Sequence, residues 1–361
     1  MKYTYEIADQ KDEAELRHFI ASMPMPGSIS IRLERNPNFF DAAAVEGNFN
    51  ETLMVRDLNG SLTGIGNRSE KSVYINGREA VIGYLSGLRV AEKHRSLRYL
   101  TQAYAQLKKL HDEGNAAFYL TTIVDENERA VKVLESGRGA LPEYKYFGEY
   151  LTFLLPSVKL NRKSAVEVRL AASSDMPQII SFLNEQGRNK QFFPVYTEKD
   201  FVSGLLKNLD KVFVAVKNGK ICGTMGIWDQ HSYKQVVVDS YSKTMKLVRP
   251  FYNFQARLRR HSILPEENRQ FNNLKVAIPL VENDDFAIFN LLLQAVSHEA
   301  FLKRKPLLFG VHEKDPFKEF LQKKSIRVYK SRAYTVCWPE NKNGLVEIDP
   351  NKVPYLELGG L

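Results

Sequence analysis

The sequence predicts an α/β protein built of two similar halves, residues 1–158 and 164–340, followed by a tail at 341–361. Its 361 residues are more than one ordinary hydrophobic core organises, which favours two domains. Each half shows the same order of patterns: strand, helix, antiparallel strands, strand, helix, strand, helix, strand. Residue identity between the halves is weak, so the duplication is inferred from the order of elements alone.

The first half opens with an extended segment, followed by a helix whose first residues are polar and which ends before Pro24. A loop is expected at 24–42, and two hairpins follow, because apolar and β-branched residues alternate around Asn59-Gly60 and Asn76-Gly77. A helix over 96–111 has the apolar spacing of one buried face. After it we expect a buried strand, a short helix and a final strand, at 116–124, 125–136 and 146–155.

The second half begins after a polar, basic linker at 157–165 and repeats this order. A helix capped near Ser173 precedes a hairpin that turns at Asn218-Gly219, and residues 235–242 are expected to continue the sheet. In each half one helix joins two strands in the pattern of a βαβ crossover. The remaining elements are expected at 274–283 (strand), 285–303 (helix), 306–312 (strand), 315–324 (helix) and 327–338 (strand).

Composition indicates a cytoplasmic protein. The two cysteines, Cys222 and Cys337, lie in apolar runs, which excludes a disulfide scaffold and fits a reducing compartment. The charged start is unlike a signal peptide, and no window approaches the length of a membrane span. No His or Cys spacing typical of a metal site occurs, so no metal is expected. Phosphate-loop, dinucleotide and nucleophile-triad signatures are likewise absent from the sequence.

Positive charge is concentrated in one stretch. The formal net charge is +9, and residues 241–275 carry eight Lys/Arg against two acids, Glu266 and Glu267. This excess has two interpretations, a surface for an anionic partner or a solvated helix face. Apart from this stretch nothing supports a nucleic-acid-binding module, so a nucleic acid partner is not expected. The sequence does not define the oligomeric state.

The segment Val90–Leu100, VAEKHRSLRYL, joins an apolar strand to the long helix of the first half. The free amides and the dipole of a helix start favour a bound anion. The turn has no glycine, but Arg95 and Arg98 can supply charge-assisted contacts. The equivalent turn of the second half, 281–289, instead carries carboxylates that would repel a phosphate. The sequence therefore predicts an anion site in the first half only.

The order of elements and this arginine turn resemble the GNAT acetyltransferase superfamily. The resemblance implies two tandem GNAT-like domains, each a mixed, largely antiparallel central sheet flanked by helices. It also implies that the first half binds acetyl-CoA or another acyl-CoA. Arg95 takes the first position of the family turn, while Arg98 and Leu100 replace its glycines, and Leu134 replaces the tyrosine that often acts as an acid. The implied cofactor-binding residues are Leu88, Arg89, Val90, Arg95, Ser96, Leu97, Arg98, Tyr99 and Asn127.

Acyl transfer to an amine needs a proton acceptor for the amine, a site for the oxyanion and a proton for the leaving thiolate. The resemblance places the oxyanion near the amide of Leu88. The central strand carries no carboxylate except Glu79, just beyond its hairpin turn, so Tyr84 and Ser86 are the best catalytic candidates, with a packing role for Tyr84 as the alternative. Tyr144 and Tyr146 are less constrained choices. An acceptor wall at Met23, Met25, Phe39 and Phe40 is a hypothesis, with burial in the core as its alternative.

The sequence thus predicts an acyl-CoA-dependent N-acyltransferase, with N-acetyl transfer the expected form and a small-molecule amine or peptide as acceptor. The alternative is a catalytically silent protein that binds a ligand or partner in the same cleft. A longer acyl donor, on CoA or on a carrier protein, is the third possibility. The missing tyrosine and glycines favour the silent protein, whereas the two arginines and Asn127 favour the enzyme.

Overall fold

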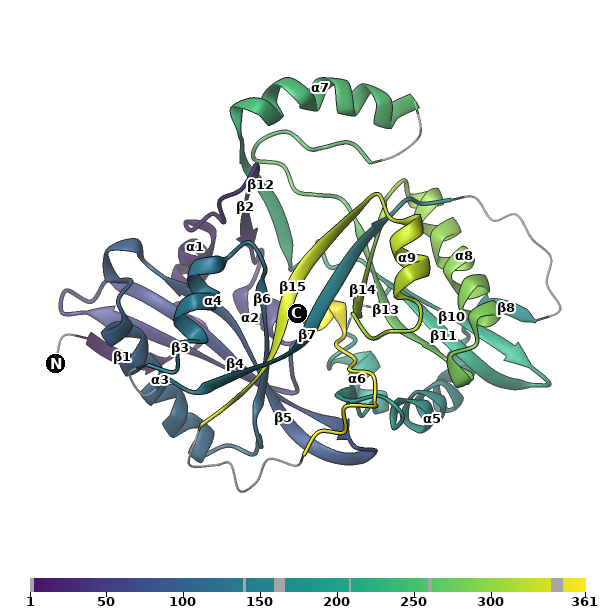
Figure 1. The fold of residues 1–361 in the computed structure, drawn as a ribbon, viewed down its shortest axis with the longest axis horizontal. Coiled ribbons are helices and arrows are strands. Elements are labelled where there is room, and N and C mark those ends of the chain that lie inside the picture. The colour runs from purple at the N-terminus through teal and green to yellow at the C-terminus, as the bar shows by residue number, and fades with distance from the viewer. Residues whose placement is uncertain (1–2, 139–140, 159–165, 208, 259–261, 339–346) are drawn as a thin grey trace.

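A computed structural model describes residues 3–138, 141–158, 166–207, 209–258, 262–338 and 347–361. One sheet of thirteen strands runs through the molecule, with helices packed on both of its faces (Figure 1). The first half contributes β1 Tyr3–Ile7, α1 Glu13–Ala21, β2 Ile29–Glu34, α2 Phe39–Ala43, β3 Phe49–Asp57, β4 Leu62–Ile75, β5 Arg78–Val90, α3 Leu97–Asp112, β6 Tyr119–Val124, α4 Glu128–Leu134 and β7 Glu143–Leu155.

The second half repeats this order with two additions, the strand β12 and the helix α7. Most of the predicted linker, residues 159–165, lies outside the described residues. The elements are β8 Glu167–Leu170, α5 Met176–Gly187, β9 Phe193–Pro194, α6 Glu198–Val202, β10 Lys211–Lys217, β11 Lys220–Trp228, β12 Gln235–Tyr241, α7 Lys243–Leu258, β13 Leu274–Val281, α8 Phe286–Lys303, β14 Leu307–His312, α9 Lys318–Lys324 and β15 Arg327–Cys337.

The predicted hairpins and crossovers are confirmed. Asn76-Gly77 and Asn218-Gly219 adopt the positive φ values of their tight turns, which is why asparagine and glycine occur there. The helices α3 and α8 each join two parallel strands, β5 to β6 and β13 to β14. Each half therefore holds the mixed, mainly antiparallel sheet that the sequence predicts.

The two halves exchange their last strands. The central strand order is β5-β6-β15-β7-β14-β13, so the last strand of the second half, β15, lies between β6 and β7 of the first. Tyr334, Val336 and Trp338 consequently pack in the core of the first half, around Tyr119. The strand β7 in turn pairs with β14. A single sheet thus spans both halves, and their cores depend on each other.

Two predictions for the segments outside the main sheet are wrong. Residues 235–241 do not continue the sheet but pair with β2 as a separate two-stranded ribbon, with Val236 opposite Leu33. Residues 24–42, predicted as a loop, contain β2 and the start of α2. The reason is that alternating residues define a strand but not its partner. Here β2 and β12 pair with each other although they lie more than 200 residues apart in the chain.

The described part of the tail is packed against the body of the protein. The amide of Gln191 donates to the carbonyl of Val353, and the carbonyl of Gln191 accepts from the amide of Tyr355. The Tyr150 hydroxyl donates to the carbonyl of Leu356 at 3.0 Å. Gly359 lies so close to the Trp228 ring that a Cβ there would be 2.3 Å from it. The described tail thus runs from Asn76 of the first half to the second half, where the Lys234 ammonium donates to the oxygen of Leu361.

The helices of the described residues include none that is long and apolar enough to cross a membrane. Cys222 and Cys337 are both buried free thiols.

Candidate active site

The strands β5 and β6 separate in the middle of the first half. They pair only at Gly83–Tyr119 and Tyr84–Leu120, whereas β5 continues for six residues beyond Tyr84. The facing β13 and β14 separate in the same way after Lys275. Each split interrupts the hydrogen-bond ladder and leaves backbone groups available to a bound ligand.

A β-bulge lies on β5 just inside the first split. The register with β4 shifts so that Asn67 opposes Ser86 but Ile65 opposes Arg89. Gly87 has φ +63°, a left-handed conformation that glycine adopts without steric cost. A bulge takes its extra residue out of the regular ladder. The backbone at Gly87 and Leu88 is therefore the part of β5 that is free to face a ligand.

A cavity of about 410 Å³ opens at this bulge and is shared by both halves. One side of its lining is largely apolar and comes from α3, β6, α4 and β7, including Leu107, Ile123, Leu134 and Tyr144. The other side is polar and comes from the ends of β2 and β5, the loop after α2, and the second half. There the charged side chains among the described lining residues are four cations and one carboxylate: Arg35, Arg89, Lys234, Lys275 and Glu46.

Glu46 is the carboxylate that the sequence did not identify. It is 6% exposed and lies in the loop between α2 and β3. Its Oε2 accepts hydrogen bonds from the Asn67 side chain at 2.8 Å and from the Ser86 hydroxyl at 2.5 Å. Its Oε1 lies 3.7 Å from the Lys234 ammonium. Two donors thus hold a buried carboxylate directly behind the hydroxyl of Ser86.

The predicted catalytic residues Tyr84 and Ser86 both line the cavity. The Tyr84 hydroxyl lies 3.0 Å from that of Thr122, and burial raises the pKa of Tyr84 well above its ordinary value. Tyr84 therefore stays protonated, and its hydroxyl is able to donate a hydrogen bond. It is also part of the core, which agrees with the packing role predicted as the alternative to catalysis.

Of the predicted cofactor residues, Leu88, Arg89 and Asn127 line the cavity. The guanidinium of Arg89 donates to the carbonyl of Leu88 at 3.0 Å. Burial of the Arg89 guanidinium and the nearby charge of Arg95 lower the pKa of Arg89. Asn127 caps α4 by accepting a hydrogen bond from the amide of Ala130 at 3.3 Å.

The other six cofactor candidates lie outside the cavity lining, where β5 ends and α3 begins. Ser96 caps α3 by accepting a hydrogen bond from the amide of Tyr99 at 3.2 Å. Tyr99 itself is buried in the core, where its hydroxyl is hydrogen-bonded to the hydroxyl of Thr63. Arg95 donates to the carbonyl of Val90 at 3.0 Å. The exposed side chains at this helix start are Arg95, Ser96, Leu97 and Arg98.

Among the other candidates, Met25 and Phe39 line the cavity, and Phe39 is also buried in the core. Tyr144 lines it too, with its hydroxyl 2.5 Å from that of Tyr104, whereas Tyr146 is 46% exposed at the surface. Glu79 is exposed and is not among the lining residues. Among the described residues, no cluster of three or more His, Cys, Asp or Glu side chains could hold a metal ion.

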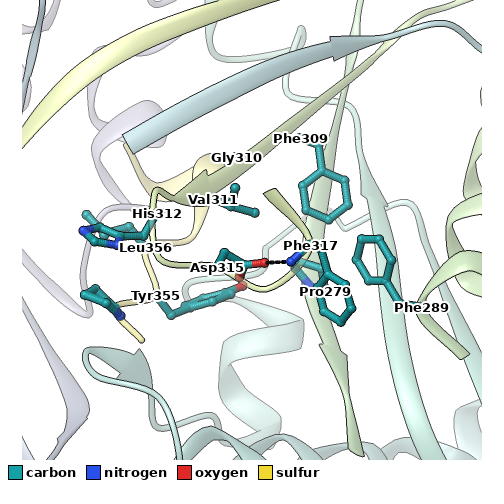
Figure 2. A pocket seen from close by; sticks show the side chains of 11 residues that line it. Pro279, Phe289, Phe309, Gly310, Val311, His312, Asp315, Phe317, Tyr355 and Leu356 are labelled. Atoms are coloured by element: carbon teal, nitrogen blue, oxygen red, sulfur yellow. Dashed lines mark hydrogen bonds between the residues drawn. The ribbon is translucent and has the colours of Figure 1, made fainter. Parts of the chain in front are cut away.

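The corresponding split of the second half is filled by the tail. Tyr355 and Leu356 lie beside His312 and Asp315 around a residual cavity of about 20 Å³ (Figure 2). At the bulge of β13, the amide of Ile278 donates to Glu357 at 2.9 Å. Asp285 caps α8 by accepting from two amides of its first turn. The split, which is open in the first half, is therefore filled here, and the helix start is capped by a carboxylate in place of the Ser96 hydroxyl.

Glu357 anchors this arrangement, and its replacement by alanine should destabilise the protein. The substitution leaves two buried donors, the amide of Ile278 and the hydroxyl of Tyr355, without their acceptor. Each such group costs about 1–3 kcal/mol. We expect the thermal midpoint of Glu357→Ala to fall by several degrees, with a smaller loss in Glu357→Gln, which keeps an acceptor oxygen. Exposed Glu347→Ala is the control, and equal midpoints for all four proteins would contradict this anchoring role.

Known structures share this architecture, although no protein-family model matches the sequence and a search of curated proteins found no match. The described fold is similar to that of solved N-acyltransferases, among them a GCN5-related N-acetyltransferase, as the sequence resemblance predicts. Two structures of Saccharomyces cerevisiae N-myristoyltransferase with bound myristoyl-CoA are similar to this chain. One is 12% identical, covers 98% of this chain and 86% of its own, and has a TM-score of 0.60. The other is 10% identical, with coverages of 93% and 82% and a TM-score of 0.59.

A GCN5-related N-acetyltransferase from Anabaena variabilis is also similar, at 8% identity and a TM-score of 0.51, over 92% of this chain and 72% of its own. Because these identities are low, the likeness establishes the fold and leaves the chemistry to be argued from the residues of this chain.

Proposed function

We propose that the protein transfers an acyl group from acyl-CoA to the amine of an acceptor that also carries a carboxylate. The observation that carries this proposal is the open β5–β6 split, with a glycine bulge and a buried Ser86–Glu46 pair at one cavity. Similar folds occur in an enzyme with bound myristoyl-CoA and in an N-acetyltransferase. These likenesses support acyl-CoA as donor and an amine or peptide as acceptor.

The donor is proposed to bind across the first split. Its pantetheine arm takes the place of a missing strand pairing along β5, and its pyrophosphate lies at the start of α3 beside Arg95 and Arg98. The apolar side of the cavity offers more room than an acetyl group requires, since it reaches from Leu107 to Tyr144. We therefore favour an acyl chain longer than acetyl, with N-acetyl transfer as the shorter alternative.

The chemistry then needs one proton acceptor and one proton donor. The attacking ammonium gives its proton through the Ser86 hydroxyl to Glu46, and the free amine attacks the thioester carbonyl. The oxyanion of the tetrahedral intermediate is bound by backbone amides at Gly87 and Leu88, which lie outside the regular ladder. As the carbon–sulfur bond breaks, Tyr84 protonates the CoA thiolate. The nitrogen of the intermediate releases its second proton, which restores the Tyr84 hydroxyl, and Glu46 passes its proton to solvent.

The charge on the polar side of the cavity is the reason for proposing that the acceptor carries a carboxylate. Four cations and one side-chain carboxylate line it. The Lys234 ammonium donates to the oxygen of Leu361 at 2.9 Å and the Lys275 ammonium to the Gln230 side chain at 2.7 Å. An excess of buried positive charge is costly. Burial lowers the pKa of Lys234 to about 8 and that of Lys275 well below its ordinary value. A bound carboxylate would offset that cost. Amino acids and peptides with a free carboxyl group are acceptors of this kind.

Isothermal titration with CoA tests the donor site. We expect binding that weakens about tenfold or more in Arg95→Ala/Arg98→Ala, because each charge-assisted contact contributes about 1.5–3 kcal/mol when fully formed. The exposed pair Arg78→Ala/Arg138→Ala, away from the turn, is the matched control and should bind as the unaltered protein does. No heat with CoA or acyl-CoA from folded protein would exclude the enzyme and leave the silent binding protein as the remaining hypothesis.

A further inference from the structure

The helix α7 stands apart from the two halves, above the β2–β12 ribbon (Figure 1). Its inner side rests on the returning segment at 262–267, not on the main core. The Asn253 side chain exchanges two hydrogen bonds with the backbone of Leu264, at 2.8 and 3.0 Å. The Arg249 guanidinium lies 5.4 Å from the centre of the Tyr241 ring. These contacts fix which side of the helix faces away from the protein.

The outward side of α7 carries a stripe of large apolar residues. Leu247, Phe251, Phe254 and Leu258 are 82%, 64%, 60% and 71% exposed. At 3.6 residues per turn they fall within an arc of about 60°, directly opposite the inner residues Asn253 and Ala256, which are buried. Single exposed apolar side chains are ordinary, but an aligned stripe of four marks a binding surface.

The charges on α7 indicate the kind of partner. The helix contains Lys243, Lys246, Arg249 and Arg257 and no acidic residue. Lys246 is paired with Glu267 at 3.1 Å, while Lys243 and Arg257 are exposed and border the apolar stripe. In a symmetric contact between two copies these cations would lie near each other without a counter-charge. An anionic lipid surface supplies the counter-charge and accepts the apolar stripe.

We propose that α7 attaches the protein to the surface of a membrane that contains anionic lipids. The four apolar side chains enter the boundary between headgroups and acyl chains, and Lys243 and Arg257 contact lipid phosphates. This combination of a bulky apolar face and a cationic border is typical of helices that lie in the membrane interface. Because α7 follows β12 directly, and Val236 of β12 lines the cavity, attachment also brings the cavity close to the membrane.

Co-sedimentation of the full chain with lipid vesicles tests this proposal. We expect binding to phosphatidylcholine vesicles that contain phosphatidylserine, and weaker binding to phosphatidylcholine alone. Phe251→Ser/Phe254→Ser should weaken binding at least about tenfold, since each loses buried apolar area. Lys243→Ala/Arg257→Ala should weaken it by about tenfold or more at low salt, because each cation near an anionic surface contributes about 1 kcal/mol.

The matched control is Leu58→Ser/Val202→Ser, which removes two side chains that are each 75% exposed elsewhere and should bind vesicles normally. Circular dichroism verifies that every variant is folded. Absence of vesicle binding, or equal binding by all variants, overturns the proposal. So does a dimer in solution that Phe251→Ser/Phe254→Ser converts to monomers, because a second copy then covers the stripe. No acyl substrate is present, so the result is independent of the proposed catalysis.

Discussion

Replacing Glu46 with glutamine is expected to lower kcat by about 10²–10⁴-fold, the usual contribution of a positioned general base. Glutamine keeps the size of the side chain and can still accept the hydrogen bond from Ser86, but it cannot take the proton of the attacking ammonium. The buried position of Glu46, with Asn67 and Ser86 both donating to it, is what makes this carboxylate the proposed base.

The pH profile separates loss of a base from a general disturbance of the site. Without Glu46 only the acceptor that is already deprotonated reacts, so the rate of Glu46→Gln should rise about tenfold per pH unit until the pKa of the acceptor amine is reached. Glu79→Gln removes an exposed carboxylate from β5, the strand that carries Ser86, and should leave kcat unchanged. A Glu46→Gln enzyme with kcat within about twofold of the original would exclude Glu46 as the base.

Replacing Lys234 with methionine is expected to reduce the preference for carboxylate-bearing acceptors by at least about 30-fold, since losing one partner of a buried charge pair costs about 2–5 kcal/mol. The measurement is the ratio of kcat/KM for an amino-acid acceptor to that for its uncharged amide. Lys71→Met is the matched control, because burial lowers the pKa of Lys71 to about 8 as well, yet Lys71 is not among the cavity-lining residues.

The proposed contact between Lys234 and the acceptor's carboxylate also predicts a pH dependence. Burial lowers the pKa of Lys234 from its ordinary value to about 8. Its cation is therefore present below pH 8 and lost as the pH rises through that value. The KM for the carboxylate-bearing acceptor should rise above pH 8, while the KM for the amide should not follow it. A preference that Lys234→Met or high pH leaves unchanged would exclude Lys234 from binding the acceptor's carboxylate.

Local patterns in the sequence were sufficient for most elements of each half. The Asn-Gly turns require positive φ, and the periodicity of residues 96–111 defines a buried helix face, so hairpins and crossovers could be placed without knowledge of tertiary contacts. The carboxylates that distinguish the turn of the second half include Asp285, which caps that helix start with its own side chain. These features depend on residues that are close in the chain.

Features that depend on distant residues could not be predicted. The pairing of β2 with β12, the insertion of β15 beside β6 and the packing of the tail in the second split each join segments whose own patterns do not name a partner. Glu46 follows the short helix α2 in the run AVEGN, where no spacing distinguishes it from a surface glutamate. Only the fold brings it to within a hydrogen bond of Ser86, which the sequence did single out.

A crystal structure of the protein with CoA tests the central claim most directly, namely that the first split is the donor site. We expect density for the pantetheine arm between β5 and β6, density for the pyrophosphate beside Arg95 and Arg98, and the thiol in the cavity near Tyr84. Density for CoA at any other place on the chain, or an empty β5–β6 split at saturating CoA, would contradict it.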